Sequence, residues 1–274
     1  MQKSTFFDII VQYNRLSLQP IINNIIEKRI FMTWGSFGTV HIASLILGAG
    51  LIVGLYFLLK CFSPKTQTIV LGILSFAGIG AIIFNLLMWD SPIEYLPFHL
   101  CSLTAMVLPF AVWTKSKVLN NLLLLWGLGA LMALVVNTAQ ANFEIFSWTF
   151  VFYYFPHLLE MGIPVLMFCL GLVKRDMKCI VSTVSITLVV YTIIHFINMA
   201  LNRYCVENEI LDWAGNVIQV NYMYSIKPEN PLLQLFYNLI PHSYWYMLLC
   251  VPVIVIYLSP IYGKQIIAAF KKKS

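Results

Sequence analysis

The stretch "SFGTVHIASLILGAGLIVGLYFLLKC" at residues 36–61 decides the fold class. It is almost wholly apolar and is longer than the ~20 apolar residues that a helix needs to cross a bilayer core. Similar runs follow along the chain. Of the 274 residues, 60% are hydrophobic and 10% are charged, whereas a soluble domain carries roughly 25% charged residues. Lipid must therefore replace water around most of the chain, and the sequence predicts a multi-pass membrane protein.

Polar breaks with turn-forming residues divide this chain into seven expected helices, which together make an all-α membrane bundle. Their approximate ranges are 36–61, 67–89, 97–115, 119–139, 147–173, 178–202 and 232–259. A long polar loop, 203–231, precedes the last of them. The bundle is expected to occupy residues 36–262, between an amphipathic interfacial arm (1–35) and a basic tail (263–274).

The charges of the connections alternate in sign. The connections after the first, third and fifth helices are basic, and so is the tail; their residues include Lys60, Lys65, Lys115, Lys117, Lys174, Arg175, Lys178 and Lys271. The other connections are acidic and contain Asp90, Glu94, Glu144, Glu207, Glu209 and Asp212. The positive-inside rule then predicts a cytoplasmic C-terminus and an outer N-terminus in the plasma membrane. Basic residues of the arm lie on the opposite side, which an arm resting on the membrane surface accommodates.

Small residues recur at helical spacing in "LGAGLIVG" (47–54) and "GLGA" (127–130). Such residues let membrane helices approach closely. We interpret both stretches as packing surfaces rather than ligand sites.

Polar residues inside the expected spans gather near the outer end of the bundle. They include all five histidines of the protein and several amides, together with one carboxylate: His41, Asn85, His99, Asn137, His157, Glu160, His195, Asn198, Asn202 and His242. A single such residue usually serves as a contact between helices, because isolated polar groups in hydrocarbon are costly. The convergence of this many predicts a shared polar pocket.

Helical spacing arranges the members of this set. His157 and Glu160 are three residues apart and share a face, so the carboxylate is expected to pair with a histidine. His195, Asn198 and Asn202 form one continuous stripe.

The stretch "LPFHLCSL" (96–103) places His99 and Cys101 two residues apart, about 200° around a helix. They are therefore not expected to be partners, unless Pro97 leaves that turn irregular. Ser102 is the residue that shares a face with His99.

Three segments carry a resemblance to a known family: "FMTWGSFGTVHIASLIL", "YLPFHLCSLTAMVLPFAVWTKSKVLNNLLLLWGLGALMAL" and "NYMYSIKPENPLLQLFYNLIPHSYWYMLL". Over residues 31–260 the chain resembles the YwaF-type integral membrane proteins of low-GC Gram-positive bacteria. It is also distantly similar to eukaryotic membrane acyltransferases and lipid hydrolases of the androgen-induced-protein type. That resemblance implies Cys101 as nucleophile and His157 as base, with His99 as a second candidate base or a structural partner.

The first hypothesis is acyl transfer or hydrolysis on a lipid ester, in which a base activates the thiol. Glu160 or Asn198 would orient the imidazole of His157. The oxyanion would be bound by a donor among Asn137, Asn198 and Ser102, and the tyrosines of the long loop, Tyr222 and Tyr224, would cover the site. The other residues expected to bind or orient the substrate include His195.

Two alternatives remain open from the sequence. One is a small-molecule transporter or binding protein, with proton relay through the histidines and Glu160. The other is a non-enzymatic partner subunit with a merely structural polar core.

The chain contains no phosphate-binding loop, metalloprotease motif or dinucleotide fingerprint, and its six cysteines form no CxxC pair. We therefore expect no metal and no cofactor. Membrane lipids are the expected partners rather than nucleic acid, and both the substrate and the oligomeric state remain open.

Overall fold

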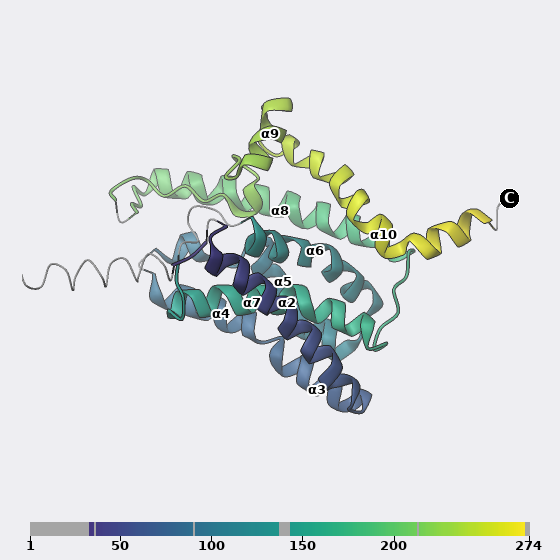
Figure 1. Ribbon diagram of the computed structural model, residues 1–274. Coiled ribbons are helices and arrows are strands. Elements are labelled where there is room, and N and C mark those ends of the chain that lie inside the picture. Colours follow the sequence, from purple (N-terminus) through teal and green to yellow (C-terminus); the bar gives the residue numbers. More distant parts are fainter. Residues whose placement is uncertain (1–32, 36, 90, 137–142, 213, 272–274) are drawn as a thin grey trace, which may run out of the picture.

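The computed structural model describes residues 33–35, 37–89, 91–136, 143–212 and 214–271. They form a polytopic membrane helix bundle, as predicted (Figure 1). The helices are α2 (Thr39–Lys60), α3 (Pro64–Leu74), α4 (Ala77–Met88), α5 (Leu100–Thr114), α6 (Lys117–Val135), α7 (Trp148–Cys169), α8 (Cys179–Glu207), α9 (Pro231–Leu239) and α10 (Cys250–Lys271). Short 3₁₀ segments are η1 (Pro92–Tyr95), η2 (Tyr222–Tyr224) and η3 (Trp245–Leu249).

Within the described ranges, six stretches are long and apolar enough to cross a membrane, with α3 and α4 counted as one. The shorter apolar α5 completes the seven predicted spans. The predicted helix at 67–89 is interrupted after Leu74, where Ser75 and Phe76 separate α3 from α4. There the Ser75 hydroxyl donates to the Gly72 carbonyl at 2.6 Å.

Several helices begin where the sequence supplies a capping side chain. The side chains of Ser63, Ser116 and Ser147 accept hydrogen bonds from backbone N–H groups in the first turns of α3, α6 and α7. Asn230 does the same for α9. Such caps satisfy donors that have no partner within the helix, so they set where each helix starts.

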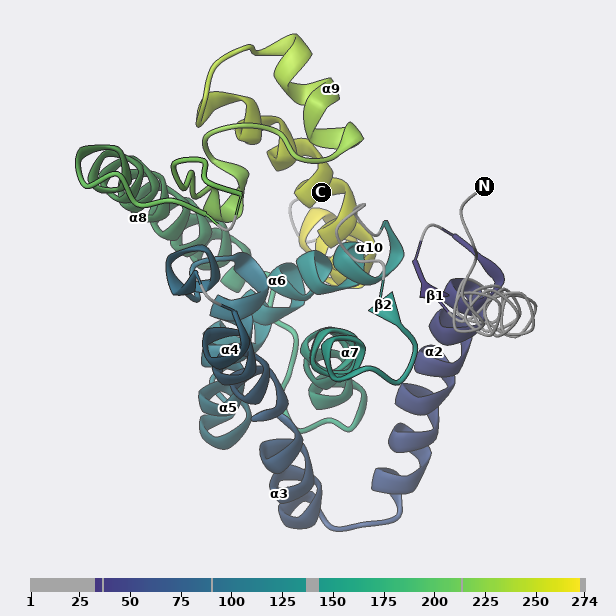
Figure 2. The same cartoon turned by 90° about the vertical axis from the view of Figure 1, so that its left-hand side faces the viewer.

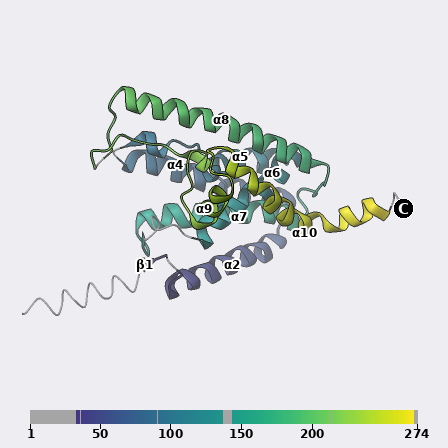
Figure 3. The same cartoon turned by 90° about the horizontal axis from the view of Figure 1, so that it is seen from above.

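Helix α7 occupies the centre of the bundle. Figure 2 shows it surrounded by α2, α4, α5 and α6, and each of these contacts it. Its C-terminal half packs in the main hydrophobic core through Ile163, Leu166 and Met167. The polar side chains that α7 carries are therefore presented inside the bundle. Helices α2 and α8 lie on opposite sides of it (Figure 3).

A two-stranded antiparallel pairing joins the start of α2 to the start of α7. Strand β1 (Thr33–Trp34) pairs with β2 (Phe143–Glu144). The Trp34 side chain is fully buried, and its indole N–H donates to the Ser44 hydroxyl at 2.7 Å. This end of the bundle is thus closed by a packed aromatic cluster.

The predicted helix at 232–259 is wrong. Helix α9 ends at Leu239, and helical structure resumes only at Trp245, first as the 3₁₀ segment η3 and then as α10 from Cys250. Ile240 precedes Pro241 and has φ −128° and ψ 89°, because a residue before proline is disfavoured in the helical region. His242 therefore lies exposed in this break rather than within a span. Helix α10 also runs on to Lys271, so part of the predicted basic tail is helical.

Candidate functional site

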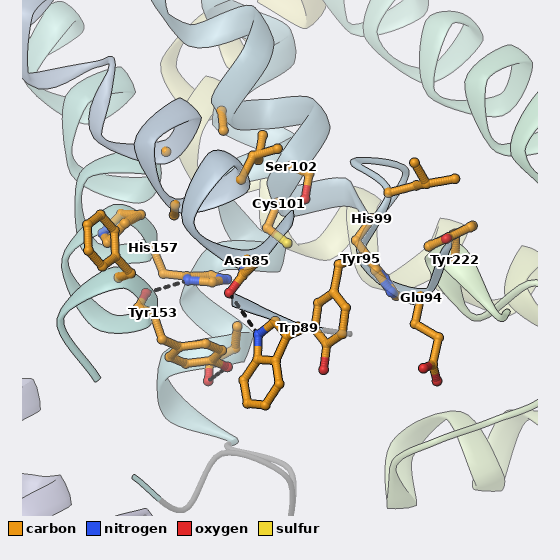
Figure 4. Close-up of a pocket in the computed structure, with 18 of the residues that line it drawn as sticks. Asn85, Trp89, Glu94, Tyr95, His99, Cys101, Ser102, Tyr153, His157 and Tyr222 are labelled. Carbon is orange, nitrogen blue, oxygen red and sulfur yellow. Dashed lines mark hydrogen bonds between the residues drawn. The ribbon is translucent and has the colours of Figure 1, made fainter. Parts of the chain in front are cut away.

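A cavity of about 570 Å³ lies among α4, α5, α7 and the loop at residues 208–230. Eight of the residues predicted for the pocket or its chemistry line it: Asn85, His99, Cys101, Ser102, His157, Glu160, Tyr222 and Tyr224. Figure 4 shows the Cys101 sulfur and the His157 imidazole directed into the cavity from α5 and α7. The structure therefore brings the expected nucleophile and base to one site, although they come from helices far apart in the sequence.

Cys101 is the second residue of α5, which starts at Leu100. No side chain caps this helix end, so the N–H groups of its first turn have no partner within the helix. Ser102 follows Cys101 directly on α5, and both residues line the cavity. A helix N-terminus of this kind favours negative charge, whether on a thiolate or on a substrate oxygen.

His99 precedes α5 in an extended conformation, with φ −73° and ψ 154°. The turn after Pro97 is therefore irregular. The angle between His99 and Cys101 that was expected for a regular helix consequently does not apply here. The imidazole packs against Tyr222 and Tyr224, with ring centroids 5.3 Å and 5.7 Å away. These contacts favour a role for His99 in seating the loop tyrosines.

The ring of His157 is oriented by its own helix. Its Nδ1 lies 2.6 Å from the Tyr153 carbonyl oxygen. A carbonyl only accepts, so Nδ1 carries a proton, and in the neutral imidazole the lone pair is then on Nε2. The Tyr153 ring lies against the imidazole with centroids 4.5 Å apart. The backbone of Tyr153, rather than Glu160 or Asn198 as predicted, therefore orients this histidine.

Glu160 lies one helical turn further along α7 and is 4% exposed. Its Oε2 atom has no hydrogen-bond partner within the described ranges, and the predicted ion pair with a histidine does not form there. A methyl group added at Gly78 of α4 would lie 2.9 Å from Oε1. Glu160 thus lies at a close approach between α7 and α4, where its Oε2 atom is buried without a hydrogen-bond partner in the described ranges.

The polar stripe on α8 serves a different purpose from the one predicted. His195 and Asn198 do not line the cavity. Asn198 donates to the Tyr222 carbonyl at 2.8 Å and accepts from the Tyr222 N–H at 3.0 Å. Asn202 makes the same pair of bonds to Val220, at 3.0 Å and 2.7 Å, and Nδ1 of His195 lies 3.0 Å from the Ser225 hydroxyl.

These bonds explain how irregular backbone is tolerated beside membrane helices. Non-helical segments at that depth need hydrogen-bond partners supplied by the protein. The stripe supplies them for the part of the 208–230 loop that reaches the cavity, and it therefore positions Tyr222 and Tyr224 there. Burial, with Cys101 and Glu229 nearby, raises the pKa of Tyr224 to about 12, so its hydroxyl stays neutral.

His41 belongs to the aromatic cluster around Trp34 and does not line the cavity. Its Nε2 donates to the Leu134 carbonyl at 2.7 Å, and its Nδ1 accepts from the Phe37 N–H at 3.1 Å. Both ring nitrogens are thus occupied by the backbone. Asn137, the remaining predicted site residue, lies outside the described residues.

Sequence reasoning missed several residues at the mouth of the cavity: Trp89, Tyr95, Asn221 and Glu229, with Glu94 considered only as a topology signal. Trp89 is the last residue of the expected helix 67–89, and the others lie in connections, from which we had predicted only Tyr222 and Tyr224 to reach the site. The sequence did offer one signal for these residues. The short connection "WDSPIEYLP", which precedes the helix that carries Cys101, is rich in aromatic and acidic residues.

A model described as the TMEM164 family matches residues 36–262 of the chain. The match therefore covers all the helices from α2 to the first half of α10. No curated protein and no solved structure matches the chain.

Proposed function

This chain belongs to the TMEM164 family of membrane proteins, and we propose that it is an acyltransferase or hydrolase that acts on lipid esters through Cys101 and His157. One observation carries the proposal. The imidazole of His157, held through Nδ1 by the Tyr153 carbonyl, has a free Nε2 in the same cavity as the Cys101 thiol. A thiol and an oriented base in one enclosed site are the requirements of nucleophilic catalysis.

The chemistry proceeds in two halves. Nε2 of His157 takes the proton of the Cys101 thiol, and the sulfur attacks the ester carbonyl carbon. The ester C–O bond then breaks, and the imidazolium returns the proton to the leaving oxygen, so that the acyl group remains on Cys101 as a thioester. Water or the hydroxyl of a second lipid then attacks the thioester, with His157 again taking and returning the proton.

The first turn of α5 supports the charged intermediates. Its N–H groups at Cys101 and Ser102 lack partners within the helix, so they are available to the oxyanion. Asn85 is a further donor from α4. Its Oδ1 accepts from the Trp89 indole at 3.4 Å, which leaves its amide N–H groups directed elsewhere. The amide of Asn198, which we expected here, is instead committed to the 208–230 loop.

The surroundings of the cavity support a lipid substrate. The outward faces of α4 and α7 carry exposed apolar side chains such as Leu87 and Phe155, and acyl chains pack against such faces in a bilayer. In this proposal the protein resides in the plasma membrane and takes its substrate from the surrounding lipids.

The test uses the full chain in lipid nanodiscs that contain a phospholipid with a fluorescent acyl ester. We expect Cys101→Ala to abolish turnover and acyl-thioester formation, and His157→Ala to slow both by about 10²–10⁴-fold. Cys169→Ala is the matched control, because that thiol is exposed at the far end of α7. Full turnover by Cys101→Ala would overturn the cysteine mechanism.

Proton-coupled transport is the second candidate, and the unpartnered Oε2 of Glu160 beside His157 favours it. Uptake driven by a pH gradient in vesicles, lost in Glu160→Gln and retained in Cys101→Ala, would support transport over acyl transfer. A purely structural polar core predicts neither turnover nor uptake, only lower stability in both variants.

A further inference from the structure

The break between α9 and α10 lies near the middle of the bilayer. Helix α8 begins after Lys178 and carries Arg203 near its other end. At 1.5 Å per residue, Thr192 lies about 21 Å from Lys178 and about 17 Å from Arg203 along the helix, close to the middle of a hydrocarbon core about 30 Å thick. The Thr192 hydroxyl lies 2.9 Å from the Tyr244 hydroxyl, and the Tyr191 hydroxyl donates to the Tyr244 carbonyl at 2.9 Å. These bonds hold Tyr244, the last residue of the break, at this depth.

Helix α9 runs across the spans at the same depth. In Figure 2 the α7 span is seen end-on, whereas α9 is seen from its side at the periphery of the bundle. One face of α9 packs inward: Leu233 is buried, and the ring centroid of Tyr237 lies 5.4 Å from that of Tyr246 in η3. Because η3 directly follows Tyr244, α9 lies level with the middle of α8.

The other face of α9 carries two amide side chains. Gln234 and Asn238 lie one helical turn apart, and both are exposed. Nε2 of Gln234 donates to Oδ1 of Asn238 at 2.9 Å. Within the described ranges this is the one hydrogen bond that the two side chains make, so the carbonyl oxygen of Gln234 and the amide N–H groups of Asn238 remain available.

Lipid alone does not satisfy these groups. The hydrocarbon core offers no hydrogen-bond partner, so polar side chains at that depth normally contact other protein segments. Asparagine and glutamine in particular join membrane helices by hydrogen bonds across their contact. Beside the amides, α9 exposes three leucines, Leu232, Leu235 and Leu239. This face therefore combines an apolar surface with a pair of amides whose hydrogen bonding is incomplete.

We propose that this face of α9 binds a second copy of the chain, through a two-fold antiparallel pairing of the two α9 helices. The available groups are self-complementary: Asn238 of each copy donates to the Gln234 carbonyl oxygen of the other, so two identical hydrogen bonds close the pair. The two-fold axis then passes close to Leu235, and the exposed leucines of both copies pack around the amides. The inference goes beyond the proposed function and does not depend on it.

The test counts copies of the full chain in liposomes. Fluorescently labelled protein is reconstituted over a range of protein-to-lipid ratios, and the copies in each complex are counted by single-molecule photobleaching. We expect the wild type to form pairs and the double variant Gln234→Leu, Asn238→Leu to pair about ten-fold more weakly, because the hydrogen bonds between the helices are lost. Asn208→Leu is the matched control, since that exposed amide bonds to the Tyr204 carbonyl at the end of α8. It should leave pairing unchanged.

A second measurement keeps both amides in place. In a chain whose exposed Cys61 and Cys169 are replaced by serine, Leu235→Cys should form a disulfide between two copies when oxidised with copper phenanthroline, because the residue lies beside the two-fold axis. Val189→Cys is the control, since Val189 is exposed on α8 at nearly the same depth, and it should crosslink far less.

Three results would overturn the interface. The first is a single copy of the wild type in each complex at every protein-to-lipid ratio, which would mean that lipid covers this face. The second is pairing of equal strength in the wild type and in the double variant, which would place the contact between copies elsewhere. The third is a crosslink at Val189 as strong as that at Leu235, which would indicate random collision.

Discussion

At the scale of single residues, the histidines differ in what their ring nitrogens contact. His41 has both nitrogens bonded to the backbone, so it has no free nitrogen for proton transfer. His157 has one nitrogen bonded to the backbone, and the other faces the cavity. The two residues look alike in the sequence, as histidines in apolar spans, and only their hydrogen-bond partners separate the structural role of His41 from the chemical role proposed for His157.

Glycine 48 gives the first residue-scale prediction. A Cβ atom at Gly48 would lie 2.3 Å from the Tyr154 hydroxyl and 3.1 Å from Leu158 Cδ1. Tyr154 donates to the Ser44 carbonyl, so it is not free to move aside. We expect Gly48→Ala to lower the free energy of unfolding by about 1–3 kcal/mol, measured by thermal unfolding in detergent.

Gly50 in the same helix is the control. A Cβ atom there meets nothing within 4 Å, so Gly50→Ala should leave the melting temperature unchanged or raise it, because alanine favours the helix. The small-residue stretch at 47–54 therefore contains one packing glycine among others that face open space. Equal melting temperatures for Gly48→Ala and Gly50→Ala would show that α2 does not pack against α7 at Tyr154.

At the scale of elements, the irregular loop depends on a regular helix. The single side chain of Asn198 makes hydrogen bonds to the N–H and the carbonyl of Tyr222 and to the Ser225 hydroxyl. Tyr222 also donates through its hydroxyl to the Ile93 carbonyl, next to Glu94. Helix α8 thus shapes the cavity without contributing a lining residue of its own.

Asn198→Ala is the element-scale prediction. Removing the amide leaves the buried Tyr222 N–H without its partner, at a cost of about 1–3 kcal/mol for the unsatisfied group, whereas the Tyr222 carbonyl keeps the Ser225 N–H at 3.4 Å. We expect faster hydrogen exchange across residues 217–225, measured by mass spectrometry, and slower ester turnover.

Asn208→Ala provides the comparison, because Asn208 is exposed and bonds only to the Tyr204 carbonyl at the end of the same helix. It should change neither exchange in the loop nor turnover. If Asn198→Ala exchanged like wild type at residues 217–225, the loop would have to be held by its other contacts.

At the scale of the whole molecule, the helix ends define two faces. The connections after α2, α5 and α7 lie at one end, together with Lys60, Lys115 and Lys178, and the 208–230 loop lies at the other. Lys117 at the start of α6 lies 3.5 Å from Asp176 in the connection between α7 and α8, which joins these parts of the basic face. The predicted orientation across the membrane therefore rests on the charges of these connections alone.

Thiol labelling in intact cells tests that orientation. In a chain whose exposed Cys61 and Cys169 are replaced by serine, we expect a membrane-impermeant maleimide to label Glu209→Cys from outside. Lys178→Cys should react only after the cells are opened, since the basic face is expected to be cytoplasmic. The reverse pattern would place the cavity mouth on the cytoplasmic side.

Much of the fold was predictable because a membrane span is a local property. A run such as 36–61 needs only its own composition to specify a helix in lipid, since each backbone group is satisfied within the helix. The break between α9 and α10 was missed because Pro241 interrupts an otherwise apolar run, and hydropathy does not detect a backbone restriction.

The sequence by itself determined that this is a multi-pass helix bundle, and it marked Cys101 and the histidines and amides of the spans as candidates for a shared polar pocket. The tertiary structure decided which polar residues meet. It placed Cys101, His157 and Glu160 around one cavity and committed Asn198 to the loop backbone. The physical reason is that hydrophobic periodicity sets how each helix faces lipid, whereas a site depends on the depth and rotation at which separate helices pack.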